Sequence, residues 1–532
     1  MFRKTGNQSH SSKPIDYEFL RNLKNMPLGT ALSANKGIVK ELFTDCSDFV
    51  IRDFWLSDGR GAFVIYIDGL VDSDLVNDAL ASLMEYGKSH KPKGDPGERI
   101  DSIVQPLPVS QTKEINNYGE LLTAVLGGDT ALFIDDSEIA LLLGLRGPKT
   151  RSVEEPASET VVRGPRDGFN ESLRVNTSLI RRRLKTPRLK AKAMVIGEQS
   201  NTNITIMYLD GIADPKRVEE VESRLRKIKI DAILESGYIE ELIQDNVYSP
   251  FPQVQYTERP DVVSAGLLQG RIAIITDGTP FVLLVPLVFW ELIQASEDYY
   301  ERFGISTLIR ILRYTFLFLA LFTPALYIAV TTFHPDMIPT TLLLSIAAAR
   351  EAIPFPAVIE AFIMEVTFEA LREAGIRLPK AIGQAVSILG ALVIGQAAVE
   401  AGIVSAPMVI VVSITGIASF TIPRFNGAIA IRLLRFPLMI LASLFGIYGI
   451  IIGTLFILVH MAGLRSFGVP YMSPVGPLKS GELHDIWIRA PWHLLQKRPS
   501  SYEPLDSRRI GTELPEKINK NSGQKGVEHE EN

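Results

Sequence analysis

The sequence predicts an α/β soluble N-terminal region, made of two similar small α/β subdomains, followed by an α-helical multi-pass transmembrane domain. Two observations predict this fold class: a drop in charge density along the chain and an internal repeat. Residues 306–465 contain 17 Asp, Glu, Lys and Arg in 160 positions, whereas the other 372 residues contain 98. A run of ~18 or more apolar residues is long enough to cross a bilayer core of ~30 Å as a helix. The block therefore predicts membrane helices.

The repeat lies in the first half of the chain. Residues 62–72 read AFVIYIDGLVD and residues 204–214 read ITIMYLDGIAD, at an offset of 142 residues. The same offset aligns a second set of residues, Leu126, Gly128, Ala131 and Asp135 with Leu268, Gly270, Ala273 and Asp277. Because two separated matches share one offset, we infer a duplicated module.

Each copy of the module predicts a β-hairpin, two helices and a further strand. In the first copy these elements are expected at 49–56 with 62–67, 74–86, 117–126 and 130–134. In the second copy they are expected at 193–196 with 204–209, 215–229, 239–244 and 271–275. The short apolar run 281–292 is compatible with a helix lying on the membrane or with a core helix of the second subdomain.

These patterns divide the chain into six segments. They are a flexible N-terminus (1–40), subdomain 1 (41–147), a basic linker (148–190), subdomain 2 (191–295), a transmembrane helical domain (296–465) and a C-terminal tail (466–532) with disorder from about residue 500. The arginines and lysines near the end of the linker favour a solvated helix face or anionic lipid head groups over nucleic acid.

The low-charge block predicts five membrane spans. They are expected at 314–332, 355–371, 381–401, 407–422 and 436–461. The apolar stretch 338–349 is short for a crossing. Lys and Arg in the short loops place the N-terminal half on the cytoplasmic side. Five spans would leave the basic tail outside, so the sequence leaves five or six crossings open.

Ionisable residues inside the predicted spans are the candidate functional residues, because such groups usually face a bundle interior or a water-filled path. The pore or gating candidates are Glu360, Glu365, Glu369, Arg350 and Glu351. Small residues four apart permit close helix packing. The helix-packing candidates are Gly449, Gly453, Ala391 and Gly395.

Motifs for common enzyme chemistries do not occur in the sequence. It contains no GxxxxGK[ST] phosphate loop, no HExxH zinc motif and no GxSxG nucleophile elbow. With one cysteine and seven scattered histidines, no zinc site is expected. We therefore expect no enzyme activity, no cofactor and no metal. The net charge of −5 indicates no particular partner.

Several long strings of this sequence closely resemble the A subunits of bacterial spore germinant receptors, the GerA family. They include ETVVRGPRDGFNESLRVN (159–176), SPFPQVQYTERPDVV (249–263), MIPTTLLLSIAAAREAIPFP (337–356) and LREAGIRLPKAIGQAVSILGALVIGQAAVEAGIVS (371–405). The resemblance runs from about residue 40 to residue 500. It implies a multi-pass protein of the inner spore membrane that acts with a permease-like B subunit and a lipoprotein C subunit.

The resemblance also implies the function. In this family the complex senses nutrients and triggers germination, and the A subunits are thought to assemble as a ring that forms a cation channel. The first hypothesis is therefore an oligomeric nutrient-gated channel subunit. The alternatives are a non-conducting scaffold or signalling subunit of the same complex, a subunit with its own nutrient pocket, and a related stage V sporulation membrane protein.

Overall fold

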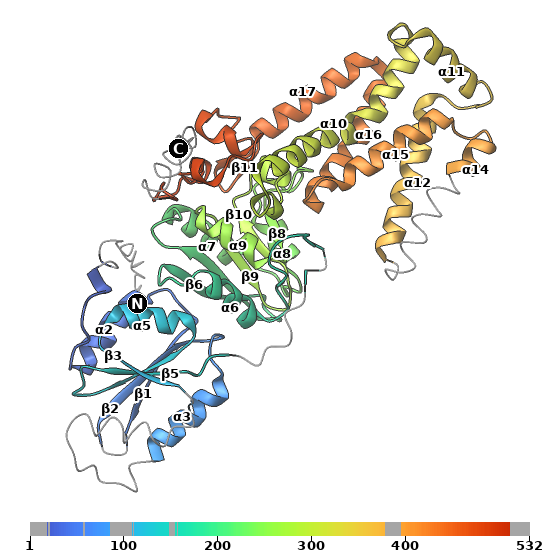
Figure 1. Cartoon of the computed structure of the whole chain (residues 1–532). Helices are drawn as coiled ribbons and strands as arrows, with labels where there is room; N and C mark the ends of the chain where they lie inside the picture. The colour runs from blue at the N-terminus through green and yellow to red at the C-terminus, as the bar shows by residue number, and fades with distance from the viewer. Residues whose placement is uncertain are drawn as a thin grey trace, which may run out of the picture. The chain divides into compact units, whose positions relative to one another are not determined.

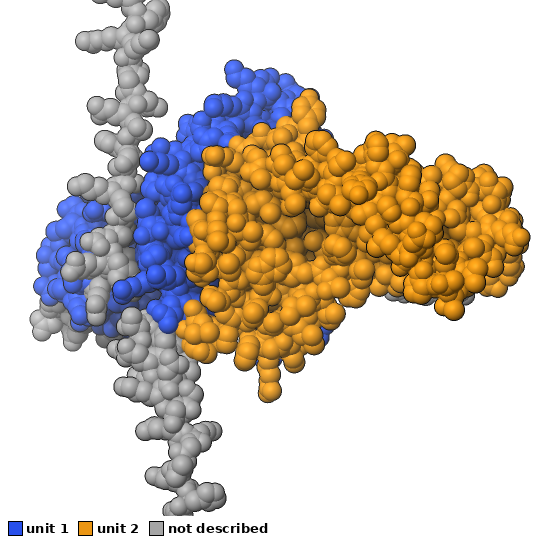
Figure 2. Space-filling view, turned by 90° about the horizontal axis from the view of Figure 1, so that it is seen from above, with its two compact units in different colours: residues 1–244, 254–286, 495–532 blue, residues 245–253, 287–494 orange. Residues whose placement is uncertain are grey.

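The computed structural model describes residue 19 and residues 22–56, 59–85, 109, 111–147, 155–156, 158–377 and 395–510. The chain forms two compact units, coloured separately in Figure 2. Unit 1 comprises residues 1–244, 254–286 and 495–532, and unit 2 comprises residues 245–253 and 287–494. Both units are thus built from segments that are far apart in the sequence.

Unit 1 contains two five-stranded antiparallel sheets with equivalent strand orders, β1-β2-β4-β5-β3 and β6-β7-β9-β10-β8 (Figure 1). The first sheet consists of β1 (Phe49–Trp55), β2 (Gly61–Ile67), β3 (Thr112–Ile115), β4 (Thr130–Ile134) and β5 (Ala140–Leu143). The second consists of β6 (Leu189–Ile196), β7 (Thr202–Leu209), β8 (Gln255–Thr257), β9 (Ile272–Thr276) and β10 (Val282–Val285).

Helices cover both faces of the first sheet. Alternate residues of a strand point to opposite faces. On β2, Phe63, Ile65 and Ile67 belong to the core formed with α2 (Leu32–Leu42) and α5 (Tyr118–Gly127). Ala62 and Val64 belong to a second core, formed with α3 (Ser73–Glu85). The subdomain is therefore a three-layer α/β/α sandwich.

The second sheet repeats this arrangement at the offset of 142 residues. The offset brings β4 onto β9, β5 onto β10 and α3 onto α7 (Pro215–Lys227). One face of the second sheet packs against α6 (Leu173–Arg183) and α9 (Pro260–Leu268). The short helix α8 (Ser236–Ile243) packs beside α7. The structural repeat thus has the same spacing as the repeat in the sequence.

Several sequence predictions for the soluble half need correction. The counterpart of α5 is α9, whereas the predicted helix 239–244 corresponds to α8, which is an addition to the repeat. The run 281–292 forms β10 and a 3₁₀ turn (Phe289–Leu292) instead of a longer helix. The predictions missed strands β3, β5 and β8 and helix α2, because these segments are short or only weakly periodic. The last part of the predicted flexible N-terminus forms α2, and Leu23 and Leu28 before it are buried.

The predicted basic linker instead contributes a helix to the second subdomain. Its helix α6 packs on the sheet, and Arg181 within it is only 1% exposed. Arg181 donates through Nε and Nη2 to the Asp48 carboxylate at 2.7 and 2.8 Å, and through Nη1 to the Leu189 carbonyl at 2.7 Å. Asp48 precedes the first sheet, so this buried pair joins the two subdomains. The charge run was interpreted as solvated because sequence alone did not reveal Asp48 as a partner.

The C-terminal tail also contributes to unit 1. Residues 495–510 belong to this unit, and Tyr502 is 1% exposed. Arg217 of α7 donates to the Tyr502 carbonyl at 2.6 Å, and the Leu505 amide donates to the Ile212 carbonyl at 3.0 Å. The prediction of disorder from about residue 500 is therefore wrong for residues 500–510, and the residues after 510 lie outside the described part of the chain.

Unit 2 is helical. It contains α10 (Phe303–Phe333), α11 (Thr340–Arg350), α12 (Ala357–Arg377), α14 (Gly395–Glu400), α15 (Ala406–Phe420), α16 (Phe425–Phe445) and α17 (Ile447–Gly463). Among the described residues, α10 and α16 are long and apolar enough to cross a membrane, while α11, α15 and α17 are shorter apolar helices. Helix α10 packs against α15, α16 and α17 around one apolar core.

The predicted span 436–461 is not one helix. The chain reverses at Gly446, whose φ of +60° lies in the left-handed region that favours glycine. Helices α16 and α17 pack together on either side of this residue. The apolar run continues without a break through the turn, so hydropathy alone does not reveal the reversal. Most of the predicted span 381–401 lies outside the described residues.

The segments that flank the helical bundle are joined to each other. Asp298, just before α10, accepts hydrogen bonds from Arg313 at 2.8 Å and from Arg310 at 3.2 Å. Arg310 also pairs with Asp485, which follows α17, at 3.3 Å. Tyr299 donates to Asp485 at 2.8 Å, and burial raises the pKa of this carboxyl while Arg310 opposes the rise. The two ends of the bundle therefore lie together.

Candidate functional site

A group of charged residues lies between α12 and α16. It consists of Glu365, Glu369 and Arg372 of α12 with Arg432 and Arg435 of α16, and we call it the charge cluster. Residues three or four apart share a helix face. The acids of α12 therefore face the same way, as do the two arginines of α16. The pairing of the earlier acid with the later arginine indicates that the helices run antiparallel here.

Glu365 and Arg435 form the fully buried part of the charge cluster. Both side chains are 0% exposed, and Nη1 of Arg435 donates to Oε2 of Glu365 at 2.6 Å. A buried ion pair is costly to desolvate, and removing one partner costs about 3–5 kcal/mol because the other charge remains buried. Each of these residues therefore requires the other in this arrangement.

Glu369 forms the more open part of the charge cluster, with 28% of its side chain exposed. It accepts hydrogen bonds from Arg372 at 3.1 Å and from Arg432 at 3.0 Å. Nη2 of Arg435 lies 3.7 Å away, beyond hydrogen-bonding distance. Arg372 is itself fixed by Ser419 of α15 at 3.0 Å, and Phe420 lies 4.8 Å from its guanidinium.

The hydrogen bonding of the charge cluster is incomplete. With all groups ionised, three guanidinium groups face two carboxylates, which leaves an excess of one positive charge. Within the described part of the chain, Oε1 of Glu365 and both Nε and Nη2 of Arg435 have no hydrogen-bond partner. Unsatisfied buried polar groups are costly, so this arrangement is less stable than one that satisfies these atoms.

The structure places Glu360 in a separate buried site. Its side chain is 0% exposed, and Oε2 accepts from the amide and hydroxyl of Ser405 at 3.0 and 2.8 Å. Arg350 at the end of α11 donates to Oε1 at 3.1 Å. Glu351 is exposed and joins neither site. The predicted pore candidates therefore divide between two places, and Glu360 and Glu365 point into the interior of this chain's own bundle.

The helix-packing candidates also have partners in the same chain. A Cβ atom on Gly449 would lie 2.0 Å from the carbonyl oxygen of Leu441, and one on Gly453 would lie 2.5 Å from Leu438. Both glycines therefore permit the close contact of α16 and α17. A Cβ atom on Gly395 would lie 3.4 Å from Val409, which is an ordinary contact. Ala391 lies outside the described residues.

The sequence prediction lacks the partners of these acids on α16. It leaves Glu369 near Arg372 but assigns no pairing to Arg432 or Arg435 and none to Ser405. A signal was nevertheless present, since acids at positions 365 and 369 match bases at 435 and 432 for an antiparallel helix pair. Without knowledge of which helices are neighbours, however, that match could not be distinguished from many others.

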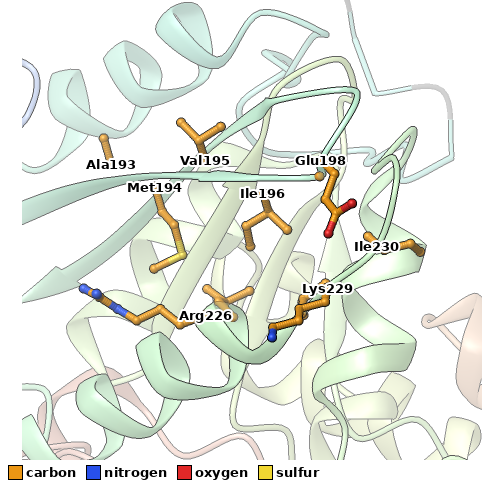
Figure 3. Close-up of a pocket in the computed structure, with 11 residues that line it drawn as sticks. Ala193, Met194, Val195, Ile196, Glu198, Arg226, Lys229 and Ile230 are labelled. Carbon is orange, nitrogen blue, oxygen red and sulfur yellow. The ribbon is translucent and has the colours of Figure 1, made fainter.

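Unit 1 carries a shallow pocket of about 490 Å³ along the edge of β6 (Figure 3). Met194 and Ile196 point toward Arg226 and Lys229 near the end of α7, while Val195 points away. The pocket combines an apolar strand face with an exposed charged rim. Its side chains do not form a convergent set of polar groups of the kind that fixes a small ligand. Across the described residues, no group of three or more His, Cys, Asp and Glu is placed to hold a metal ion.

Comparisons with known proteins agree on one family. The family model described as Bacillus/Clostridium GerA spore germination protein matches residues 37–501. The chain is 52% identical over 93% of its length to an uncharacterized membrane protein, YfkQ, of Bacillus subtilis, covering 93% of that protein. It is 47% identical to spore germination protein KA of Bacillus subtilis, over 91% of this chain and 89% of that protein.

The chain is also similar to a protein of another species and to a protein of solved structure. Spore germination protein GerLA of Bacillus cereus is 40% identical over 87% of this chain and 93% of its own length. The crystal structure of the N-terminal domain of the A subunit of the Bacillus megaterium spore germinant receptor GerK3 is 37% identical. It covers 49% of this chain and 97% of that chain, with a TM-score of 0.39. The chain belongs to the GerA family of spore germination proteins.

Proposed function

We propose that this chain is a multi-pass A-type subunit of a nutrient germinant receptor in the inner membrane of the spore, and that it forms an oligomeric nutrient-gated cation channel. The B and C subunits of the receptor are its expected partners. The observation that carries the proposal is the charge cluster, which lies between helices of an apolar bundle. Ionisable groups are rare at such places and usually mark ion pathways or switches.

The exposed surface of the helices supports an assembly in the membrane. Many large apolar side chains of unit 2 point outward, including Leu344 on α11, Ile417 on α15 and Phe456 on α17, which are 60% exposed or more. In water such a surface would favour aggregation. Lipid or neighbouring subunits would bury it, and helices shorter than a full span need neighbours at membrane depth.

The joined ends of the bundle support an even number of crossings. Asp298 and Asp485 both form ion pairs with Arg310. We infer that the segments before α10 and after α17 lie on the same side of the membrane. With the N-terminal half in the cytoplasm, as the loop charges predict, the tail lies there too. This arrangement favours six crossings over five and removes the conflict posed by the basic tail.

The channel proposal is tested by ion release from spores. Spores carrying Glu360→Gln or Glu365→Gln are compared with spores carrying the wild-type chain for nutrient-triggered release of monovalent cations, with protein level measured by immunoblot. A several-fold change in rate or a changed ion preference at normal abundance is expected if these acids act in conduction. Glu373→Gln is the matched control, since Glu373 lies on α12 but is exposed and paired with Arg377 at 2.5 Å.

Unchanged release from both variants at normal abundance would contradict a conducting role for these acids. That result would favour the non-conducting scaffold, in which unit 1 recruits partners and substitutions there abolish the response. The two outcomes are separable because the scaffold predicts no change in ion preference from any substitution in unit 2.

A further inference from the structure

Arg435 lies between two carboxylates and bonds only one of them. Its Nη1 is 2.6 Å from Glu365, while its Nη2 is 3.7 Å from Glu369. Nε and Nη2 have no hydrogen-bond partner among the described residues. A guanidinium group presents its donors as a rigid fork, so the free side of this fork already faces the second acid.

The two acids are equivalent by position but differ in their surroundings. They are four residues apart on α12, about 6 Å along its axis. Glu365 is completely buried and, among the described residues, has Arg435 as its one hydrogen-bond partner, whereas Glu369 is partly exposed and also pairs with Arg372 and Arg432. Ser419 anchors Arg372 from α15. Glu369 is therefore an acceptor that two other arginines hold in place.

We propose that Arg435 is a movable counter-ion that passes from Glu365 to Glu369 when the channel opens, an inference that rests on the proposed channel function. In the closed arrangement Arg435 neutralises Glu365. A shift of α16 along α12 of less than one turn brings Nη2 and Nε of Arg435 to Glu369 and releases the Glu365 carboxylate. The released acid then attracts cations, as acidic groups in a pore do.

This hand-over explains two observations together. The buried acid Glu365 is neutralised in the described structure, and the arginine that neutralises it has spare donors aimed at a second acid. Release of Glu365 leaves a buried acid without its partner, so the second arrangement lies higher in free energy. A ligand bound elsewhere shifts the population when it favours that second arrangement by a comparable amount. Nutrient on a partner subunit needs only to favour the second arrangement.

The test uses spores with the complete receptor and measures cation release with and without nutrient. Arg435→Gln is expected to leak cations without nutrient at least tenfold faster than wild type, because Glu365 is no longer neutralised. Adding Glu365→Gln to that variant is expected to abolish the leak. Glu369→Gln is expected to slow the nutrient response about tenfold, while Glu373→Gln matches wild type with and without nutrient.

Arg435→Lys keeps the positive charge but removes the forked guanidinium donors. This variant tests the hand-over if the Arg435→Gln protein does not accumulate. It is expected to lower the nutrient concentration for half-maximal release several-fold, because a point charge holds Glu365 less firmly. Wild-type behaviour of Arg435→Lys and Glu369→Gln at normal abundance would overturn the hand-over. If Glu360→Gln and Glu365→Gln also leave release unchanged, the channel proposal itself fails, so the two failures are distinguishable.

Discussion

Arg181 is buried where the two subdomains of unit 1 meet, and its charge has a defined partner there. All three nitrogen atoms of its guanidinium group donate hydrogen bonds, two to Asp48 and one to the Leu189 carbonyl. Arg181→Gln is expected to lower the free energy of unfolding by about 3 kcal/mol, because Asp48 remains without its partner. Thermal or denaturant unfolding of the purified protein measures the change.

Arg182 provides the matched control for this substitution. It is the next residue of α6 and is exposed. Arg182→Gln is expected to change the free energy of unfolding by less than about 0.5 kcal/mol. Equal effects of the two substitutions would mean that the pair with Asp48 contributes nothing beyond general surface charge.

Glu240 on α8 gives unit 1 a pH-dependent stability. Burial raises its pKa to about 7, and the neighbouring Glu235 adds to the rise. Between about pH 4.5 and 7 the unfolded chain has lost a proton that the folded chain keeps, so the stability contributed by this group falls as pH rises through that window. Above pH 7 the penalty is constant.

Glu240→Gln removes this penalty. The variant is expected to be more stable than wild type at pH 8, by the order of 1 kcal/mol because water reaches part of the side chain, and equally stable at pH 4. Melting curves at the two pH values measure the difference. Glu241→Gln alters an exposed neighbour on the same helix and is expected to show no such pH dependence.

Among the elements, the α16–α17 hairpin depends on glycines at the contact between its two helices, and Gly449 is the more tightly enclosed. A Cβ on Gly449 would meet the Leu441 carbonyl oxygen, which belongs to the backbone and has little freedom to move. Gly449→Ala is therefore expected to destabilise the protein by about 2 kcal/mol or more, seen as lower abundance and a lower melting temperature in detergent. Gly463→Ala, with nothing within 4 Å, is the control. A tolerated Gly449→Ala would mean that the hairpin opens easily.

The elements also show which features the sequence predicts well. Hairpins β1–β2 and β6–β7 and helix α7 follow from alternating or helical patterns bounded by turn residues, and these predictions agree with the structure. Strands β5 and β10 and the reversal at Gly446 were missed, because continuous apolar runs carry no period that separates strand, helix and turn. The acids of the charge cluster were found by composition, whereas their arginines required knowledge of which helices are neighbours.

For the whole molecule, the joined ends of the bundle predict which side of the membrane each exposed position faces. Labelling of single cysteines with a thiol reagent tests this. In a chain with Cys46→Ser, single cysteines replace Tyr248, Leu478 or Met337, which are 98%, 70% and 65% exposed. Positions 248 and 478 are expected to react with a membrane-impermeant thiol reagent from the same side. Position 337, beyond the far end of α10, is expected to react from the opposite side. Labelling of 248 and 478 from opposite sides would contradict an even number of crossings.

The return of residues 495–510 to unit 1 has a consequence for the order of synthesis. Arg217, which is 6% exposed, has its partners Tyr502 and Glu503 more than 280 residues later in the chain. At roughly 5–20 residues per second, the ribosome needs about 10–40 s to proceed from residue 286 to residue 495. During that interval the helices of unit 2 are synthesised, and unit 1 still lacks residues 495–510. A chain that stops before residue 495 leaves this gap in unit 1 unfilled, so completion of unit 1 depends on synthesis of all the helices of unit 2.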